Sequence, residues 1–133
     1  VYGPREISTG PYATAIRIFK ERFLKKEPLG VVRPGTQKRN FTHVDDIVSG
    51  LILVGENGSG DGFGIGSEQS YAILDIANMF CSEIVMLPER KGNRMGSSID
   101  TTKIRSLGWS AKNDIASYVK ELTTASLGNV AVL

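Results

Sequence analysis

The sequence has little cysteine, no large excess of either charge and no long apolar run. Cys81 is the single cysteine among 133 residues, so no disulfide can form within the chain, which suits a reducing compartment such as the cytoplasm. The net charge of +2 is too small to indicate nucleic-acid binding, which usually needs a strong basic excess on one face. No stretch approaches the roughly 18 apolar residues of a membrane span. We therefore expect a cytoplasmic protein with neither a nucleic-acid nor a membrane partner.

Motifs for metals, nucleotides and acid–base catalysis are also scarce. No Cys or His cluster has metal-ligand spacing, and His43, the only histidine, has no second ligand or nucleophile nearby in sequence. The glycine-rich segment 58–64 follows a predicted helix and precedes a predicted strand, which is the wrong order for a dinucleotide-binding loop. The sequence therefore predicts no metal site and no catalytic residue of its own.

The order of apolar and turn-forming residues predicts an α/β chain of ordinary composition, 41% hydrophobic and 23% charged. Apolar runs and turn signals predict short strands at 1–2, 29–32, 41–44, 63–66 and 84–87. Helical spacing predicts five helices, from Pro11 to before Pro28 and then over about 45–54, 73–80, 101–107 and 115–122. Alternation of this kind predicts layers of helices on a small mixed sheet, with 123–133 as a frayed tail.

Several side chains carry specific structural expectations. Tyr12 is predicted on the inner stripe of the first helix and Lys20 on its wet side, while the helix after Asp46 reads as apolar enough to be buried on more than one face. The alternate glycines Gly64 and Gly66 predict close approach of another backbone or a ligand.

Asp45 and Asp46 are a candidate carboxylate pair for acid–base chemistry. Adjacent residues on a helix point in different directions, so the two carboxylates cannot easily share one site. We interpret them as first-turn residues that offset the helix dipole, and His43 as structural.

Arg39 and Arg90 are the strongest candidates for a binding role from residue chemistry. Both lie at element ends, and a planar guanidinium suits phosphate oxygens better than the point charge of lysine. Two arginines that converge from distant segments would clamp a diphosphate; the alternative is that each is a solvated surface cation. The helix start near 11–14 is a second possible anion site, or an ordinary capped helix end.

A set of short motifs resembles a known family. The motifs occur in order, with sensible spacing, at 1–5, 29–32, Gly35, 39–47, Arg90 with Gly92, and 107–109. They resemble the C-terminal half of the nucleotide-sugar epimerases and dehydratases, which are extended short-chain dehydrogenases. The resemblance covers residues 1 to about 122, and the block 39–46 is its most specific part.

The resemblance implies the C-terminal, substrate-binding part of an extended short-chain dehydrogenase from which the Rossmann half is missing. That half carries NAD, a glycine-rich loop and a Tyr-x-x-x-Lys catalytic pair, none of which this chain contains, so we expect the fragment alone to be inactive. By resemblance, Val1 and Tyr2 lie near the nicotinamide of the cofactor, and Ala13 and Thr14 lie near the diphosphate of the substrate.

The same resemblance assigns four further positions to the nucleotide diphosphate sugar. Arg39 and Arg90 match arginines that contact the diphosphate, and Val32 belongs to the segment that lies along the base. Asn93 stands where the family usually has Asp or Glu for the ribose. An amide can still bond a hydroxyl, but it loses the charge-assisted part of that bond.

The function that follows from the resemblance is the nucleotide-sugar-binding portion of an NAD-dependent nucleotide-sugar 4-epimerase. The alternatives are a 4,6-dehydratase, a 4-keto reductase, or a non-catalytic binding or scaffold protein of the same fold. We also expect a homo-oligomer, since self-association could cover apolar surface that the Rossmann half would otherwise bury.

Overall fold

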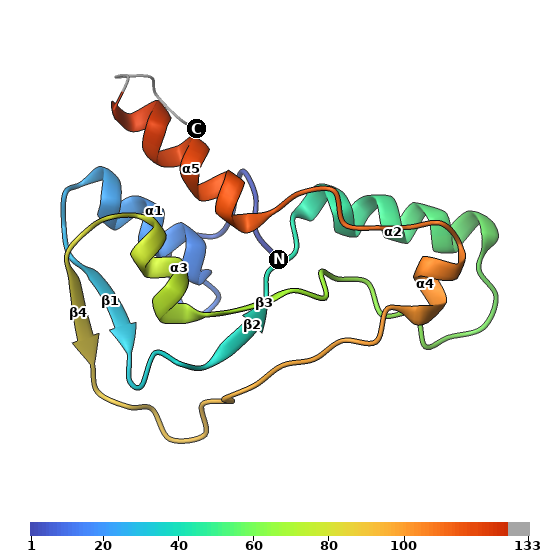
Figure 1. The fold of residues 1–133 in the computed structure, drawn as a ribbon, viewed down its shortest axis with the longest axis horizontal. Coiled ribbons are helices and arrows are strands. Elements are labelled where there is room, and N and C mark those ends of the chain that lie inside the picture. The colour runs from blue at the N-terminus through green and yellow to red at the C-terminus, as the bar shows by residue number, and fades with distance from the viewer. Residues whose placement is uncertain (128–133) are drawn as a thin grey trace.

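The computed structural model describes residues 1–127, which form an elongated α/β arrangement (Figure 1). The elements in chain order are α1 Ala15–Leu24, β1 Leu29–Val32, β2 Lys38–Asn40, α2 Val44–Asn57, β3 Ser70–Ala72, α3 Ile73–Met79, β4 Ile84–Leu87, α4 Thr102–Ser106 and α5 Ile115–Leu127. Figure 1 shows α1, α3, α5, β1 and β4 gathered at one end of the molecule, and α2 and α4 at the other. The predicted α/β class with about five helices is confirmed.

The strands form two separate small sheets, one parallel and one antiparallel, in place of the single small mixed sheet that the sequence predicts. β1 pairs in parallel with β4, with Leu29 opposite Ile84, and β2 pairs antiparallel with β3, with Lys38 opposite Ala72. The predicted strand end at the N-terminus is present as an isolated parallel bridge between Tyr2 and His43.

Two predicted strands are placed differently by the structure. The strand expected at 41–44 lies earlier, over Lys38–Asn40, because α2 already begins at Val44 with the His43 imidazole as its cap. The strand expected at 63–66 does not form, and the pairing strand is instead Ser70–Ala72. The close approach predicted at Gly64 is confirmed, since a Cβ there would collide with the backbone carbonyl of Asp100.

The core lies between α1, β1, α3 and α5. Phe80 packs edge-on against Phe19, with the ring centroids 6.0 Å apart, and Leu29 and Val31 of β1 are fully buried beneath them. The last helix, predicted over about 115–122, buries Ile115, Val119 and Leu122 in this core. That helix extends to Leu127, beyond the predicted boundary at 122, and residues 128–133 of the predicted tail lie outside the described part.

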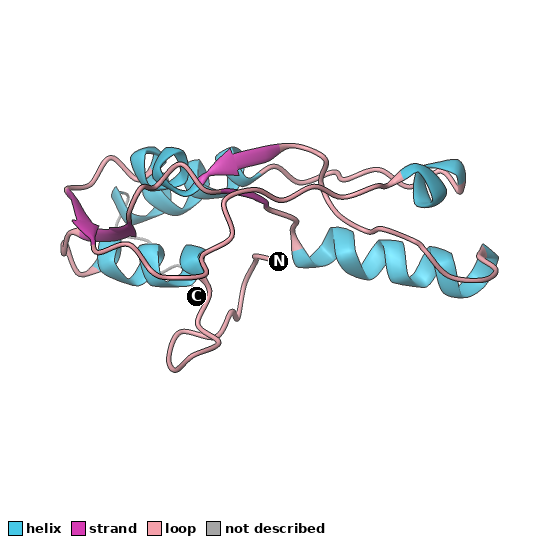
Figure 2. Cartoon of the chain, turned by 90° about the horizontal axis from the view of Figure 1, so that it is seen from below, coloured by secondary structure: helices cyan, strands magenta, loops and turns pink. Residues whose placement is uncertain are grey.

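Helix α1 begins later than the sequence predicted. The Thr14 hydroxyl, on extended backbone, accepts the Arg17 N–H at 3.3 Å, so the helix starts after Thr14 rather than at Pro11. Tyr12 is left outside the helix and is 80% exposed. Lys20, expected on the wet side, is buried because it lies one turn after Ile16 on the same inward face. The chain between Tyr2 and α1 forms a loop that stands away from the helices (Figure 2).

Helix α2 is not buried on several faces, contrary to prediction. Val48, Leu51 and Ile52 are 46%, 58% and 56% exposed and form one free apolar stripe at helical spacing. The opposite face packs through Gly50, whose missing side chain leaves room for Ile104.

None of the helices within residues 1–127 combines the length and the hydropathy needed to cross a bilayer.

Candidate functional site

A pocket of about 360 Å³ lies between α1, the edge of β1 and the loop after β4. Thirteen residues from six segments line it: Ala13, Ala15, Ile18, Phe19, Arg22, Gly30, Val32, Gln37, Arg39, Ile73, Leu87, Arg90 and Asn93. The set contains three arginines and no carboxylate, so the pocket favours an anionic ligand.

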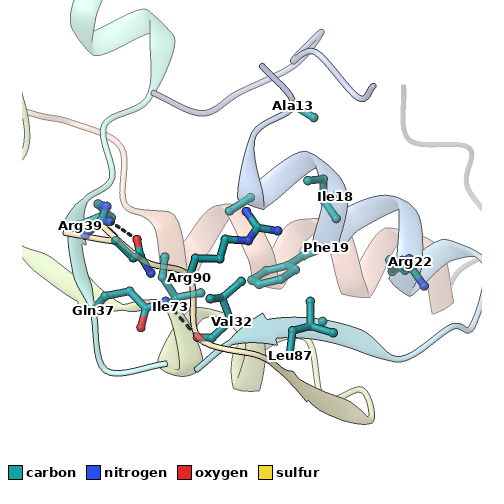
Figure 3. A pocket seen from close by; sticks show the side chains of 13 residues that line it. Ala13, Ile18, Phe19, Arg22, Val32, Gln37, Arg39, Ile73, Leu87 and Arg90 are labelled. Atoms are coloured by element: carbon teal, nitrogen blue, oxygen red, sulfur yellow. Dashed lines mark hydrogen bonds between the residues drawn. The ribbon is translucent and has the colours of Figure 1, made fainter. Parts of the chain in front are cut away.

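One part of the pocket is apolar and suits a flat ring. Figure 3 shows Phe19, Val32 and Leu87 between Arg90 on one side and Arg22 on the other. Gly30 keeps this part open, because a Cβ there would meet the Leu87 Cδ1 atom at 2.9 Å.

The edge of β1 beside the pocket carries free backbone groups. In a parallel pair, alternate residues turn both backbone groups to the same neighbour. Leu29 and Arg33 donate their N–H groups to the carbonyls of Glu83 and Leu87 at 2.8 and 2.9 Å, so they face β4. Gly30 and Val32 therefore face the other edge, which pairs with no strand among residues 1–127. This edge can hydrogen-bond the rim of a planar ligand.

Gln37 fixes part of that edge. Its Nε2 atom donates to the Val32 carbonyl at 3.0 Å, and its side chain is buried. Within the described part of the chain, the Val32 N–H and both backbone groups of Gly30 have no backbone partner.

The two predicted phosphate-binding arginines line the same pocket although they come from distant segments. Arg39 is the middle residue of β2. Its Nη1 atom donates to the Lys38 carbonyl at 2.7 Å, and its Nη2 atom donates to the Asn93 Oδ1 atom at 3.3 Å. Arg90 belongs to the loop after β4, and its guanidinium extends across the pocket toward α1 (Figure 3). Ala13 and Ala15 place the N-terminal end of α1 at the rim, where the helix dipole favours negative charge.

The structure thus brings together Arg39, Arg90, Val32, Asn93 and Ala13, and leaves out three other predicted contacts. Thr14 is absent from the lining, and its hydroxyl caps α1 and donates to the Glu6 Oε1 atom at 2.9 Å. That the five lining residues bind a substrate, and that Thr14 also contributes, stays a prediction.

Val1 and Tyr2, the predicted cofactor contacts, lie away from the pocket. Val1 is 67% exposed, whereas Tyr2 is fully buried against the rings of His43 and Tyr118. Burial, with the charge of Asp114, raises the pKa of the Tyr2 phenol well above its ordinary value. Both backbone groups of Tyr2 are used, since it donates to Thr42 and accepts from Val44. A role of Val1 and Tyr2 toward NAD stays a prediction.

His43, Asp45 and Asp46 lie at the start of α2, and both carboxylates are in its first turn, as the sequence predicts. The His43 Nδ1 atom accepts the Asp45 N–H at 3.0 Å and so caps α2. The Asp45 side chain is 81% exposed, whereas the buried Asp46 carboxylate accepts the N–H groups of Lys112 and Asn113. Within residues 1–127, no three His, Cys, Asp or Glu side chains are grouped closely enough to hold a metal ion.

Sequence reasoning missed Gln37, Gly30 and the face of α1 that lines the pocket. Ile18, Phe19 and Arg22 share this face through helical spacing, so the sequence does contain a signal for it. Gln37 lies between a turn and Arg39, and nothing in its position along the chain indicates that its amide reaches back to Val32.

The fold defines an α/β protein with a pocket that is lined by three arginines and no carboxylate. Comparison with known proteins narrows this class. Residues 1–66 match the NAD dependent epimerase/dehydratase family, and similarity to its members extends over most of the chain. The chain belongs to this family.

Two curated relatives show the range of activities in the family. The chain is 30% identical over 119 residues to "UDP-glucuronic acid decarboxylase 5" of Arabidopsis thaliana, covering 84% of this chain and 34% of that protein. It is 27% identical over 117 residues to "UDP-glucose 4-epimerase" of Mycolicibacterium smegmatis, covering 82% of this chain and 37% of the relative. The chain therefore spans about a third of the length of these relatives.

Solved structures confirm the fold at the same partial coverage. The UDP-glucose 4-epimerase of Thermotoga maritima, crystallised with UDP-glucose, superposes with a TM-score of 0.84 and 30% identity, over 96% of this chain and 43% of the epimerase. The dTDP-glucose 4,6-dehydratase DesIV of Streptomyces venezuelae superposes with a TM-score of 0.75 and 24% identity, over 91% of this chain and 41% of the dehydratase. These structures are extended short-chain dehydrogenases of the epimerase/dehydratase type, as the sequence motifs predicted.

Proposed function

We propose that this chain is the nucleotide-sugar-binding portion of an NAD-dependent nucleotide-sugar 4-epimerase. The observation that carries the proposal is a single pocket with Arg39 and Arg90 on one side and an open strand edge beside apolar side chains on the other. A nucleoside diphosphate has the matching parts, two phosphates and a flat base. Similarity to a UDP-glucose 4-epimerase at 30% identity supports the choice of reaction.

In this proposal the chain binds and orients the substrate. The guanidinium groups of Arg39 and Arg90 hold the diphosphate, with the N-terminal end of α1 adding its dipole. The base lies against Val32 and Leu87 and bonds the free backbone groups of β1. Holding the nucleotide at two points fixes the direction in which the sugar leaves the pocket, and orientation of this kind is a large part of enzymatic rate enhancement.

The catalytic pair and most of the NAD site belong, in this proposal, to parts of the protein outside these 133 residues. NAD supplies hydride abstraction at the sugar C4 and its return to the other face. Of the two residues predicted near the nicotinamide, Val1 is exposed enough to touch a cofactor, whereas the Tyr2 side chain is fully buried and both Tyr2 backbone groups are hydrogen-bonded within the fold. We infer that these 133 residues alone have no turnover.

A second candidate is decarboxylation of a UDP-uronic acid, favoured by the relatives named UDP-glucuronic acid decarboxylase. A 4,6-dehydratase, a 4-keto reductase and a non-catalytic scaffold of the same fold remain further alternatives. Incubation of the full-length protein with UDP-glucose and with UDP-glucuronic acid, followed by product analysis, separates these activities. Turnover of neither substrate, together with intact UDP binding, would favour the scaffold.

We also propose that the protein is cytoplasmic and a homo-oligomer. The free apolar stripe of α2, made by Val48, Leu51 and Ile52, is the surface for which burial would be most favourable. Sedimentation of the full-length protein tests the oligomeric state, and a clean monomer would contradict it.

The binding test compares alanine variants of three arginines by calorimetry with UDP. Arg39→Ala and Arg90→Ala should each weaken UDP binding by about 10- to 100-fold, since hydrogen bonds to charged groups are worth about 1.5–3 kcal/mol each. Arg94→Ala is the matched control, because this substitution removes the same charge. Arg94 is exposed and does not line the pocket. It should change affinity less than about twofold at 0.15 M salt, where exposed charges are screened. Equal losses for all three variants, or no UDP binding by the wild type, would overturn the proposal.

A further inference from the structure

Asn93 connects the two arginines of the pocket. Its side-chain oxygen accepts from the Arg39 Nη2 atom at 3.3 Å, across 54 residues of sequence. Its backbone N–H donates to the Arg90 carbonyl at 3.3 Å and so closes the turn that carries Arg90. One residue therefore touches both of the segments that supply positive charge.

The chemistry of this contact fixes the orientation of the Asn93 amide. A guanidinium carries only donors, so the amide atom that faces Arg39 must be the oxygen. The nitrogen faces away and offers donors only. A ribose hydroxyl could meet Nδ2 only as a neutral acceptor, so the charge-assisted bond that a carboxylate would accept from it is lost, whereas a phosphate oxygen would accept from Nδ2 with a full negative charge.

The neutrality of the amide also matters. A carboxylate at this position would form an ion pair with Arg39 and cancel part of its field on a bound diphosphate. An amide holds the guanidinium without removing its charge. All three side chains at this end of the pocket, Arg39, Arg90 and the free side of Asn93, then present donors.

Building on the proposed function, we infer that Asn93 is a positioning residue that holds Arg39 toward the diphosphate, and is not a ligand of the ribose hydroxyls. Its contribution to binding passes through Arg39. This assignment replaces the ribose role that resemblance gave to Asn93.

The test measures binding of UDP, 2′-deoxy-UDP and uridine to the full-length protein, using calorimetry for the nucleotides and NMR titration for uridine. Asn93→Ala should weaken UDP and 2′-deoxy-UDP equally, by about 5- to 10-fold, and leave uridine unchanged. Asn93→Asp keeps an acceptor for Arg39 but adds a negative charge, so it should also weaken UDP and leave uridine unchanged. In an Arg39→Ala background, Asn93→Ala should cause no further loss.

The results that would overturn this inference differ from the result that would overturn the proposed function. A larger loss for UDP than for 2′-deoxy-UDP, tighter UDP binding by Asn93→Asp, or additive losses in the double variant would show a direct ribose contact and overturn the inference. An equal loss for uridine would show a general effect on the loop and would also overturn it. In each of these cases wild-type UDP binding stands, so the proposed function survives. Failure of the wild type to bind UDP would overturn both.

Discussion

Asp46 provides the sharpest test of how the fold is held together. It is 3% exposed, and its Oδ1 and Oδ2 atoms accept the backbone N–H groups of Lys112 and Asn113 at 3.1 and 3.0 Å. Its own carbonyl accepts the Trp109 Nε1–H at 3.1 Å. The first turn of α2 is thereby tied to the segment that leads from α4 into α5.

We expect Asp46→Ala to lower the free energy of unfolding by about 3 kcal/mol. Each hydrogen bond to a carboxylate contributes roughly 1.5–3 kcal/mol, and the lower value applies because the donors are only partly buried. Asp45→Ala is the matched control on the same helical turn. Its side chain is 81% exposed, so it should lose only the helix-dipole term of about 0.5 kcal/mol.

Urea unfolding followed by tryptophan fluorescence measures both variants. Trp109 is the only tryptophan of the chain and lies in the contact itself, so its emission reports directly on this segment. Asp46→Asn should fall between alanine and wild type, because an amide retains one acceptor but turns a donor toward the second N–H. If Asp46→Ala differs from Asp45→Ala by less than about 1 kcal/mol, the carboxylate bonds do not have the role argued from their geometry.

Two further stability predictions rest on single positions. Tyr2→Phe should leave the unfolding free energy unchanged or raise it by up to about 1 kcal/mol, since the buried Tyr2 hydroxyl has no hydrogen-bond partner among residues 1–127. Burial raises the pKa of Tyr2 above the ordinary tyrosine value near 10, so the folded state favours the neutral phenol. The contribution of this preference to the free energy of unfolding is present below about pH 10 and is lost as the pH rises further. Alkaline unfolding should therefore be shallower in Tyr2→Phe, and a steeper profile would contradict this. Gly64→Ala should cost about 2–3 kcal/mol in urea unfolding through its collision with the Asp100 carbonyl, while Gly96→Ala, in open space, should cost little; equal effects would refute the close approach.

Local signals in the sequence predicted the elements whose ends are set by neighbouring residues. β1 and β4 lie where apolar runs meet turns, and the carboxylates of Asp100 and Asp114 accept backbone N–H groups at the starts of α4 and α5. The positions and exposure of the other elements depend on long-range packing. Nothing near α2 indicates that its apolar stripe stays free, since an apolar residue does not specify the surface that covers it.

The candidate site could likewise be predicted from the sequence only in part. Residue chemistry and family resemblance singled out Arg39, Arg90, Val32, Asn93 and Ala13, and all five line one pocket. Their mutual contacts could not be predicted, because the bond from Arg39 to Asn93 joins segments 54 residues apart. Gln37 was missed for the same reason, since its partner is set by the path of the turn rather than by a motif.

Two neutral amides hold the two halves of the pocket before any ligand binds. The Gln37 side-chain nitrogen donates to the Val32 carbonyl at the edge of β1, and the Asn93 side-chain oxygen accepts from Arg39 and holds its guanidinium at the side of the pocket. Side chains fixed in this way lose little rotamer freedom when a ligand arrives, so less of the interaction energy is spent on ordering them. Neither amide introduces a negative charge into the pocket. The pocket therefore combines preorganisation with an undiminished positive field, which is the combination that orientation of an anionic substrate requires.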